Sequence, residues 1–470
     1  MSATATTEKK YLKWYQKLAY GAGDLASNCS YGLVASFVLL YLTGTMGLDS
    51  AIIGSLMLAS KVLDGISDVI FGTLIDRTHS KLGKARPWML FGQVGVSLCL
   101  FLLFAIPAGS TTMQYIYFFI VYTALNAVFY TANGIAYSSL VALITKNNNE
   151  RVQLGSFRFM FAVVTNIFMG FAVTGMVEKF GSGAAGWRTT ALIFAIVGLV
   201  VNTISCLAVK ELPEEELSDN TSEAAEEGKA VAKEKKHGFA ETAKILVHNK
   251  YYLMILAIYI VYYIMSNLTT GAGVFCATYY WGDGSLLGQF SMMKMFPVII
   301  ALAIAPVLIK KTGSMQKVNF WGYAISSVLG IPMIYFAMQK NLSMFLLFMF
   351  IKGIFAGTLS GSLNALIAEA SGYTTRTTGV HMDGMMYSCS SLGVKVGGGI
   401  GTAAVGWLLK LGGFVGTATV QSESAIRMIF NLYITFPFVI GIIITVLLAF
   451  LDVEKANKKW DAEHQKEAQA

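Results

Sequence analysis

The sequence predicts an all-α membrane protein with twelve transmembrane helices. Of its 470 residues, 55% are hydrophobic and only 13% are charged, whereas soluble domains carry about 25% charged residues. Apolar runs of about 18 residues or more recur along the chain, and each is long enough to cross a ~30 Å hydrocarbon core. A transmembrane β-barrel would instead show short segments of alternating hydrophobicity. The length of the apolar runs therefore favours helices.

Twelve apolar segments can be counted, six on each side of a polar stretch. They cover residues 16–43, 51–76, 88–108, 114–144, 157–180, 188–209, 251–280, 288–309, 318–338, 343–369, 381–411 and 426–451. The polar stretch at 210–249 has low hydrophobicity and high charge, which predict a flexible cytoplasmic linker. We therefore expect a six-helix bundle at 1–209, the linker, a second six-helix bundle at 250–452 and a cytoplasmic tail at 453–470.

The basic residues are concentrated on one side of this layout. They lie in the N-terminal segment, in the loops after even-numbered spans and in the tail, while the opposite loops are nearly uncharged. Cytoplasmic loops carry the excess of Lys and Arg, so both termini are expected in the cytoplasm of a multi-pass inner (plasma) membrane protein. The net charge of +8 then reflects topology and contact with the lipid bilayer, not nucleic acid. The five cysteines lie in apolar segments and are interpreted as small buried hydrophobes.

Two carboxylates interrupt the second apolar segment. Asp64 and Asp68 are four residues apart, so they share one helix face and repel each other. A charge at mid-bilayer costs roughly 2.5–3.5 kcal/mol on insertion scales. We expect a cation or a proton to neutralise the pair. The alternative is that both carboxylates only pair with basic neighbours, for which Lys61 and Lys395 are the candidates.

The loop after the second segment carries an ordered motif. Its residues Gly72, Asp76, Arg77, Lys84 and Arg86 follow the Gly-x-x-x-Asp-Arg…Gly-Lys/Arg signature of major facilitator transporters, whose six-plus-six layout the chain also shares. The resemblance predicts a major facilitator fold of two six-helix bundles. It also predicts a gating role for these five residues, with Asp76 accepting hydrogen bonds from a facing helix end. Topology alone would explain the Lys and Arg residues, but not Gly72 and Asp76.

Further motifs are spread over the whole chain. They are Tyr20-Gly-Ala-Gly-Asp24, Asp64-Gly-Ile-Ser-Asp68, Gly83-Lys-Ala-Arg-Pro-Trp88, Tyr130-Thr131 leading to Tyr137-Ser-Ser-Leu140, Glu150-Arg-Val-Gln-Leu154 with Arg158, Gly379-Val-His-Met-Asp-Gly-Met-Met-Tyr387 and Val394-Lys395-Val-Gly-Gly398. In this order and on these segments, they resemble the glycoside–pentoside–hexuronide:cation symporter family.

The resemblance implies a cation site on the second and fourth segments. In the family the two carboxylates hold the coupling cation with help from a hydroxyl, which carries over to Asp64, Asp68 and Thr131. Na⁺ and Li⁺ are hard ions that prefer oxygen ligands, while two close carboxylates can also bind a proton, because one pKa is pushed upward. Ser67 stands where sodium-using members carry an asparagine. The coupling ion is therefore Na⁺ or, alternatively, H⁺ or Li⁺, with a slight preference for sodium.

The resemblance also implies a sugar site near the midplane between the halves. It nominates Asp24, Tyr130, Arg158 and Lys395, because carboxylates accept from sugar hydroxyls while Arg and Lys donate to sugar oxygens. Two further residues join this predicted substrate-binding set. They are Tyr31, a possible ring face or hydroxyl, and Asn133, beside the position where galactoside-binding members carry an acid. Snorkelling of Arg158 to headgroups and simple packing of Tyr31 are the alternatives.

Several positions depart from the family pattern. Gly134 replaces the acid of galactoside-binding members, and fewer acidic groups precede the eleventh segment. With Arg158 and Lys395 retained, a uronide or another anionic glycoside becomes a candidate, although both residues accompany neutral substrates in the family as well. His381 is either a pH sensor or an ordinary satisfied polar residue. The glycine run 393–401 predicts close helix packing, with a hinge as the alternative.

These observations favour a symporter. We expect cation-coupled import of a sugar, glycoside or glycuronide by alternating access, by a monomer without a cofactor. The alternatives are the same fold carrying a lysolipid or another amphiphile, an uncoupled facilitator, or a channel. An enzyme is not expected, because the five His are scattered and form no catalytic spacing.

Overall fold

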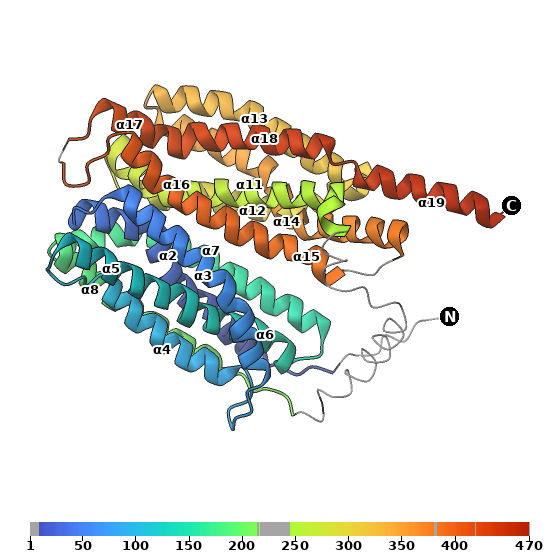
Figure 1. Cartoon of the computed structure of the whole chain (residues 1–470), viewed down its shortest axis with the longest axis horizontal. Coiled ribbons are helices and arrows are strands. Elements are labelled where there is room, and N and C mark those ends of the chain that lie inside the picture. The colour runs from blue at the N-terminus through green and yellow to red at the C-terminus, as the bar shows by residue number, and fades with distance from the viewer. Residues whose placement is uncertain (1–8, 214–215, 217–244, 380–382, 419, 470) are drawn as a thin grey trace. The chain divides into compact units, whose positions relative to one another are not determined.

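Helices form all the regular structure that the computed structural model describes, which is residues 9–213, 216, 245–379, 383–418 and 420–469 (Figure 1). The α-helices are α1 (Trp14–Gly21), α2 (Gly23–Leu40), α3 (Ser50–Asp76), α4 (Arg86–Leu103), α5 (Thr111–Thr123), α6 (Thr131–Ile144), α7 (Asn148–Lys179), α8 (Gly183–Ala208), α11 (Lys250–Phe275), α12 (Leu286–Thr312), α13 (Met315–Met338), α14 (Leu342–Thr378), α15 (Asp383–Leu392), α16 (Gly398–Leu411), α17 (Glu423–Phe430), α18 (Phe436–Phe450) and α19 (Val453–Gln469). Five π-helical segments join some of them: η1 (Tyr41–Thr45), η2 (Ala124–Tyr130), η3 (Cys276–Tyr280), η4 (Gly393–Gly397) and η5 (Asn431–Thr435).

The predicted membrane spans are present. Within the described residues, eleven continuous helical stretches are long and apolar enough to cross a bilayer. Helix α3, which carries Lys61, Asp64 and Asp68, is not among the eleven, but its 27 residues extend over about 40 Å. Counted with the others, α3 makes the number consistent with the expected twelve, and the all-α membrane class is confirmed.

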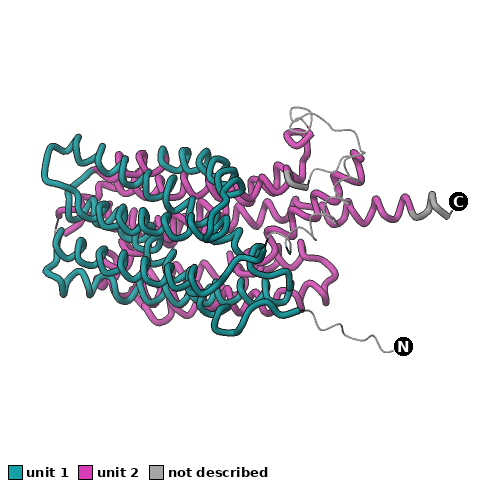
Figure 2. The backbone as a smooth tube through the Cα atoms, turned by 90° about the horizontal axis from the view of Figure 1, so that it is seen from below, with its two compact units in different colours: residues 1–48, 59–236 teal, residues 49–58, 237–470 magenta. Residues whose placement is uncertain are grey.

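The chain forms two compact units, coloured separately in Figure 2. Unit 1 contains residues 1–48 and 59–236, and unit 2 contains residues 49–58 and 237–470. The division resembles the expected one, except that the first residues of α3 belong with the second half. Most of the expected linker, at 214–215 and 217–244, lies outside the described residues.

Small residues explain why the start of α3 belongs to unit 2. A Cβ on Gly54 would lie 2.7 Å from the carbonyl oxygen of Ala403, so α3 and α16 touch through their backbones. The Ser50 hydroxyl donates to the carbonyl of Gly406 at 2.9 Å, and the Trp407 indole donates to Ser55 at 2.9 Å. Close approach of this kind needs small side chains at the crossing.

An ion pair at the same place gives a pH prediction. Burial raises the pKa of Asp49, but the pairing with Lys410 at 2.6 Å and the N–H groups of Ala51 and Ile52 outweigh it, so its pKa lies below the ordinary value. A pKa that folding lowers gives stability that is complete above the unfolded pKa of about 3.9 and is lost below it. Asp49→Asn should therefore lower the melting temperature at pH 7 and flatten its decline below about pH 4. Melting curves of detergent-solubilised protein test this; parallel curves for variant and wild type would contradict it.

The core of unit 1 fixes the first helices. The hydroxyl of Tyr20 donates to the carbonyl of Tyr137 at 2.5 Å, and the hydroxyl of Tyr137 donates back to the carbonyl of Tyr20 at 2.7 Å. Added Cβ atoms would meet the Phe157 side chain at Gly21 (2.5 Å) and the Tyr137 ring at Gly23 (2.8 Å). The glycines of the Tyr20-Gly-Ala-Gly motif thus allow close helix packing, and this packing fixes the position of the next residue, Asp24.

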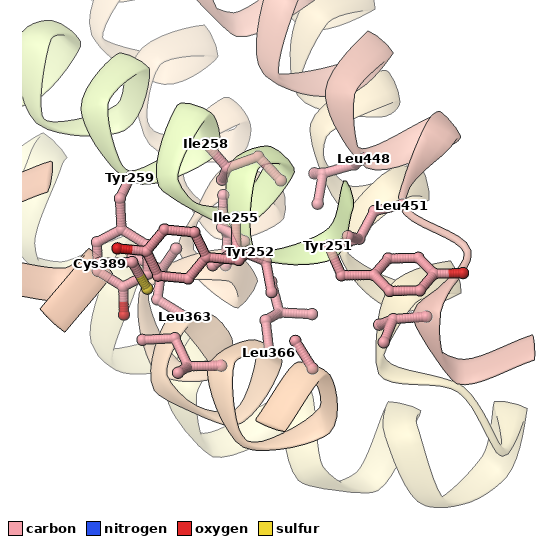
Figure 3. Packing of buried hydrophobic residues seen from close by; sticks show 14 of the residues in the cluster. Tyr251, Tyr252, Ile255, Ile258, Tyr259, Leu363, Leu366, Cys389, Leu448 and Leu451 are labelled. Carbon is pink, nitrogen blue, oxygen red and sulfur yellow. The ribbon is translucent and has the colours of Figure 1, made fainter. Parts of the chain in front are cut away.

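The core of unit 2 is rich in aromatic side chains. Tyr251, Tyr252 and Tyr259 of α11 pack with Leu363 and Leu366 of α14, and further apolar residues of α15 and α18 complete the cluster (Figure 3). The glycine run packs η4 and α16 against α11: a Cβ on residue 397 or 401 would lie 2.5 or 2.6 Å from a carbonyl oxygen of that helix. The packing interpretation of this run is confirmed.

The C-terminal segment forms a helix, which the sequence analysis did not predict. Glu454 of α19 accepts from the Ser314 hydroxyl and from the backbone N–H of Gln316 at 3.0 Å. The Asn457 amide donates to the Glu369 carboxylate at 2.9 Å. These contacts attach α19 to the start of α13 and to the C-terminal part of α14 within unit 2.

Candidate cation and substrate site

Asp64 is the best-defined member of the predicted cation site. Its residue is 8% exposed, in the middle of α3. The hydroxyl of Thr131 donates to one carboxylate oxygen at 2.6 Å, and the ammonium of Lys61 lies 3.5 Å from the other. The structure therefore brings together two of the three predicted ligands, 67 positions apart in sequence.

A π-helical segment places Thr131. Segment η2 ends at Tyr130, and the hydroxyl of Thr131 also reaches the carbonyl of Asn126 at 2.9 Å. Such π-segments are frequent at functional sites. One hydroxyl carries a single proton, so Thr131 can donate to Asp64 or to Asn126, but not fully to both. Its oxygen thus remains adaptable as a ligand.

Asp68 lies one turn further along α3 and is half-buried. The Ser67 hydroxyl between the two carboxylates donates to the backbone carbonyl of Asp64 at 2.9 Å. Within the described residues, no cluster of three or more His, Cys, Asp or Glu is placed to hold a metal. Carboxylate and hydroxyl oxygens suit Na⁺ or Li⁺ better than a transition metal.

Lys61 links the cation residues to the predicted substrate residues. Its ammonium lies 5.9 Å from the ring centroid of Tyr31, close enough for a cation–π interaction. The rings of Tyr31 and Tyr130 stack with centroids 5.5 Å apart. Tyr130 immediately precedes Thr131. One continuous group of side chains in unit 1 therefore runs from Asp64 to the two tyrosines, and we call it the Asp64–Tyr130 group.

Asp24 and Arg158 form a second pair in unit 1. The guanidinium Nε lies 2.5 Å from the Asp24 carboxylate, and the guanidinium carbon lies 4.2 Å from the ring centroid of Tyr137. Both side chains are less than a third exposed. Arg158 is thus held among protein groups, which favours the predicted pocket over snorkelling.

Asn133 differs from the other predicted substrate residues. Its residue is 2% exposed, and its amide donates to the carbonyl of Met89 at 2.7 Å. Asn202 of α8 donates to the same carbonyl at 2.9 Å. The structure places Asn133 at the packing of α4, α6 and α8, so we assign it to helix packing instead of substrate contact. Its neighbour Gly134 faces open space, since a Cβ there would meet no atom within 4 Å.

Lys395 lies in unit 2. It is half-buried within the π-helical segment η4, which packs on α11. His381 lies outside the described residues, so the choice between a pH sensor and an ordinary polar residue stays untested.

Two intramembrane lysines were missed by the sequence analysis. Lys294 on α12 and Lys352 on α14 both line a cavity inside unit 2. Both could have been found in the sequence. Each lies inside an expected membrane span, at 288–309 or 343–369, where a lysine costs as much free energy as Asp64 or Asp68 does in the second span.

The predicted gating loop is organised by an unpredicted carboxylate. Glu211 accepts from the backbone N–H groups of Lys84, Ala85 and Arg86 at 2.7, 3.0 and 3.0 Å. These donors include the unpaired N–H groups at the start of α4, which a negative charge stabilises. Gly83 has φ +111°, and a Cβ there would collide with Glu211. The loop therefore needs glycine for both its conformation and its space.

The remaining gating residues lie beside this cap. Gly72 faces open space, while Asp76 and Arg77 are exposed, and their side chains make no hydrogen bond or ion pair with any described residue. The Arg86 side chain donates to the carbonyl of Cys206 at 3.2 Å. Their gating role stays a prediction.

Removing the Glu211 carboxylate should loosen the loop. Glu211→Ala leaves three backbone donors without their acceptor, and loss of such a cap costs about 1–2 kcal/mol. Hydrogen exchange at residues 84–86 should accelerate about 10-fold. Glu216→Ala is the matched control, because the Glu216 side chain is 43% exposed and its one ion pair among the described residues is with Lys9 at 3.6 Å. Unchanged exchange in Glu211→Ala would show that the cap does not hold the loop.

The helical fold and the intramembrane ionisable residues are those of a membrane transporter of the major facilitator type. A solved bacterial homologue of the human lysosomal transporter Spinster, inward-facing and unoccupied, covers 95% of this chain and 98% of its own, with a TM-score of 0.68 and 13% identity. At this identity the likeness shows the fold alone. The chain belongs to the family described as MFS/sugar transport protein, which it matches over residues 19–455, and within it to the glycoside–pentoside–hexuronide:cation symporters.

Two curated relatives match almost the whole chain. The isoprimeverose transporter of Lactiplantibacillus pentosus is 26% identical over 466 residues, covering 98% of this chain and 93% of that protein. The putative glycoside/cation symporter YagG of Escherichia coli (strain K12) is 24% identical over 446 residues, covering 94% and 92%.

Proposed function

We propose that the protein is a cation-coupled symporter that carries a sugar or glycoside across the cell membrane by alternating access. One observation carries the proposal: Asp64, the predicted cation ligand, is joined through Lys61 to Tyr31 and Tyr130, the predicted substrate residues. The names of the relatives, an isoprimeverose transporter and a glycoside/cation symporter, support the cargo class.

The coupling follows from charge. In the structure, Lys61 supplies the positive charge beside Asp64. A cation bound at Asp64, Asp68 and Thr131 would repel the ammonium of Lys61 and release it toward the rings of Tyr31 and Tyr130. An ammonium there can donate to sugar hydroxyls. Cation binding would thus complete the substrate site, so the protein binds cargo well only when the ion is present.

Asp24 and Arg158 supply the second set of groups. A carboxylate can accept hydrogen bonds from two sugar hydroxyls, and the planar guanidinium can donate two parallel hydrogen bonds to sugar oxygens. In the structure each neutralises the other at 2.5 Å. We further propose a monomer with both termini in the cytoplasm, as the basic loops indicate.

Ion movement driven by substrate tests the proposal. A panel of neutral glycosides and glycuronides is added to cells that express the protein, with a sodium electrode and a pH electrode in the medium. We expect one sugar class to draw in Na⁺ in step with its uptake. A pH change without sodium dependence would assign the proton as the coupling ion. The absence of any ion movement during uptake would reject symport.

A further inference from the structure

Unit 2 contains a cavity of about 190 Å³ among α11, α12, α13, α14 and α18. Its volume is well above the ~10–15 Å³ that one water needs. Much of its wall is apolar and adaptable, with Met265, Met293, Met349 and Phe438 among the lining residues. Two basic side chains also line it, Lys294 from α12 and Lys352 from α14.

Neither lysine has an acidic partner within the described part of the chain. The ammonium of Lys294 donates to the hydroxyls of Thr269 and Thr270, both at 3.3 Å. Lys352 makes no hydrogen bond or ion pair with any described residue. The sequences of α11, α12, α13, η5 and α18 contain no Asp or Glu. Helix α14 contains only Glu369, whose carboxylate accepts from Asn457.

Unit 1 shows the opposite arrangement. There the intramembrane Lys61 and Arg158 each lie beside a carboxylate, Asp64 and Asp24. In unit 2 the chain offers two threonine hydroxyls to Lys294, but no described carboxylate lies beside either lysine. Lys294 and Lys352 lie on the second and fourth spans of their half, as Asp64 and Thr131 do in theirs. Two positive charges around one cavity therefore lack a negative charge, which a ligand can supply.

We propose that this cavity binds the anionic group of the cargo, a carboxylate or a sulfonate, through Lys294 and Lys352. The inference rests on the proposed function and narrows it: the cargo is an anionic glycoside, such as a uronide. The hydroxyls of Ser266 and Ser326, which also line the cavity, can donate to the remaining anion oxygens. The methionine-lined wall receives an apolar aglycone, since methionine adapts to varied shapes.

Matched ligand pairs test the inference. Full-length protein in lipid nanodiscs is titrated with 4-nitrophenyl uronides and with the 4-nitrophenyl pyranosides of the same configuration and linkage. The variants are Lys294→Met and Lys352→Met. Lys310→Met is the matched control, because Lys310 is an exposed lysine on the same helix α12. We expect wild type and control to bind the uronide at least 10-fold more tightly than the pyranoside. In each cavity variant the ratio of the two dissociation constants should fall by about 10-fold.

A stability readout separates charge from folding. Both cavity variants remove a half-buried charge that has no acidic partner among the described residues, so without ligand they should melt at or above the wild-type temperature. The uronide should raise the melting temperature of wild type and control by more than it raises that of either variant at the same concentration. A wild type that prefers the pyranoside, or a preference that both variants retain, would overturn the inference and leave the proposed function standing.

Failure of the proposed function gives a different result. In that case neither glycoside binds and neither exchanges in counterflow. Lysophosphatidylglycerol, which joins an anionic group to an apolar body, is the additional probe. If it alone raises the melting temperature, and only while both lysines are present, the cargo is a lipid anion and both the proposed function and the glycoside inference are rejected.

Discussion

Asp64→Asn is expected to abolish concentrative uptake. The substitution keeps the shape of the side chain but removes the charge that Lys61 and the cation share. The cation loses one of its two carboxylate ligands, and an interaction with a charged group is worth about 1.5–3 kcal/mol, which corresponds to about 10- to 100-fold in ion affinity. Sodium-driven uptake into proteoliposomes should fall by that factor.

Two variants of Thr131 sharpen this prediction. Thr131→Ser keeps the hydroxyl that donates to Asp64 at 2.6 Å, so it should retain most of the uptake. Thr131→Val has nearly the same volume but no hydroxyl, and it should lower ion affinity by about 10-fold. Because a misfolded protein would also fail to transport, melting temperatures are compared first. Full concentrative uptake by Asp64→Asn would remove this carboxylate from the cation site.

Breaking the pair between Asp24 and Arg158 should have the second large effect. Asp24→Asn leaves a guanidinium without its partner, and Arg158→Gln leaves a carboxylate, so each should lower the melting temperature and reduce transport by about 100-fold. The double variant removes both charges. We expect it to recover most of the stability, with a coupling energy of about 1–3 kcal/mol, while transport stays lost.

The double variant separates two roles of this pair. If Asp24 and Arg158 only stabilise the fold, transport will return together with the melting temperature. If they contact the sugar, transport will not return. Lys459→Gln is the control for a surface pair: Lys459 and Glu463 are exposed and 3.8 Å apart, and such pairs contribute little.

Local sequence patterns were sufficient for much of the fold. Span length and apolar content are properties of single segments, so the twelve spans and the break near residue 210 could be predicted without knowing their neighbours. The start of α3 could not be assigned to its unit in the same way. Residues 49–58 belong to unit 2 because Gly54 and Ser50 fit against α16, and this fit depends on residues some 350 positions away.

The candidate site shows the same division. The spacing of Asp64 and Asp68 predicted a shared helix face, and the family motif nominated Thr131. Asn133 was nominated by its neighbour in sequence, yet helix rotation turns its amide toward Met89. Glu211 was missed because its hydrogen bonds to residues 84–86 cross more than 120 positions.

The sequence by itself determined the membrane class, the two halves, the family and the positions of the intramembrane carboxylates. Each of these depends on the length of an apolar segment, on residue spacing within one helix or on the order of motifs along the chain. Only the tertiary structure decided which groups from different helices lie together: Asp64 with Thr131, and Asp24 with Arg158. It also showed that Lys294 and Lys352 share a cavity whose described lining residues include no acid. The physical reason is that contacts between helices depend on their rotation and crossing, which the pattern of one helix does not specify.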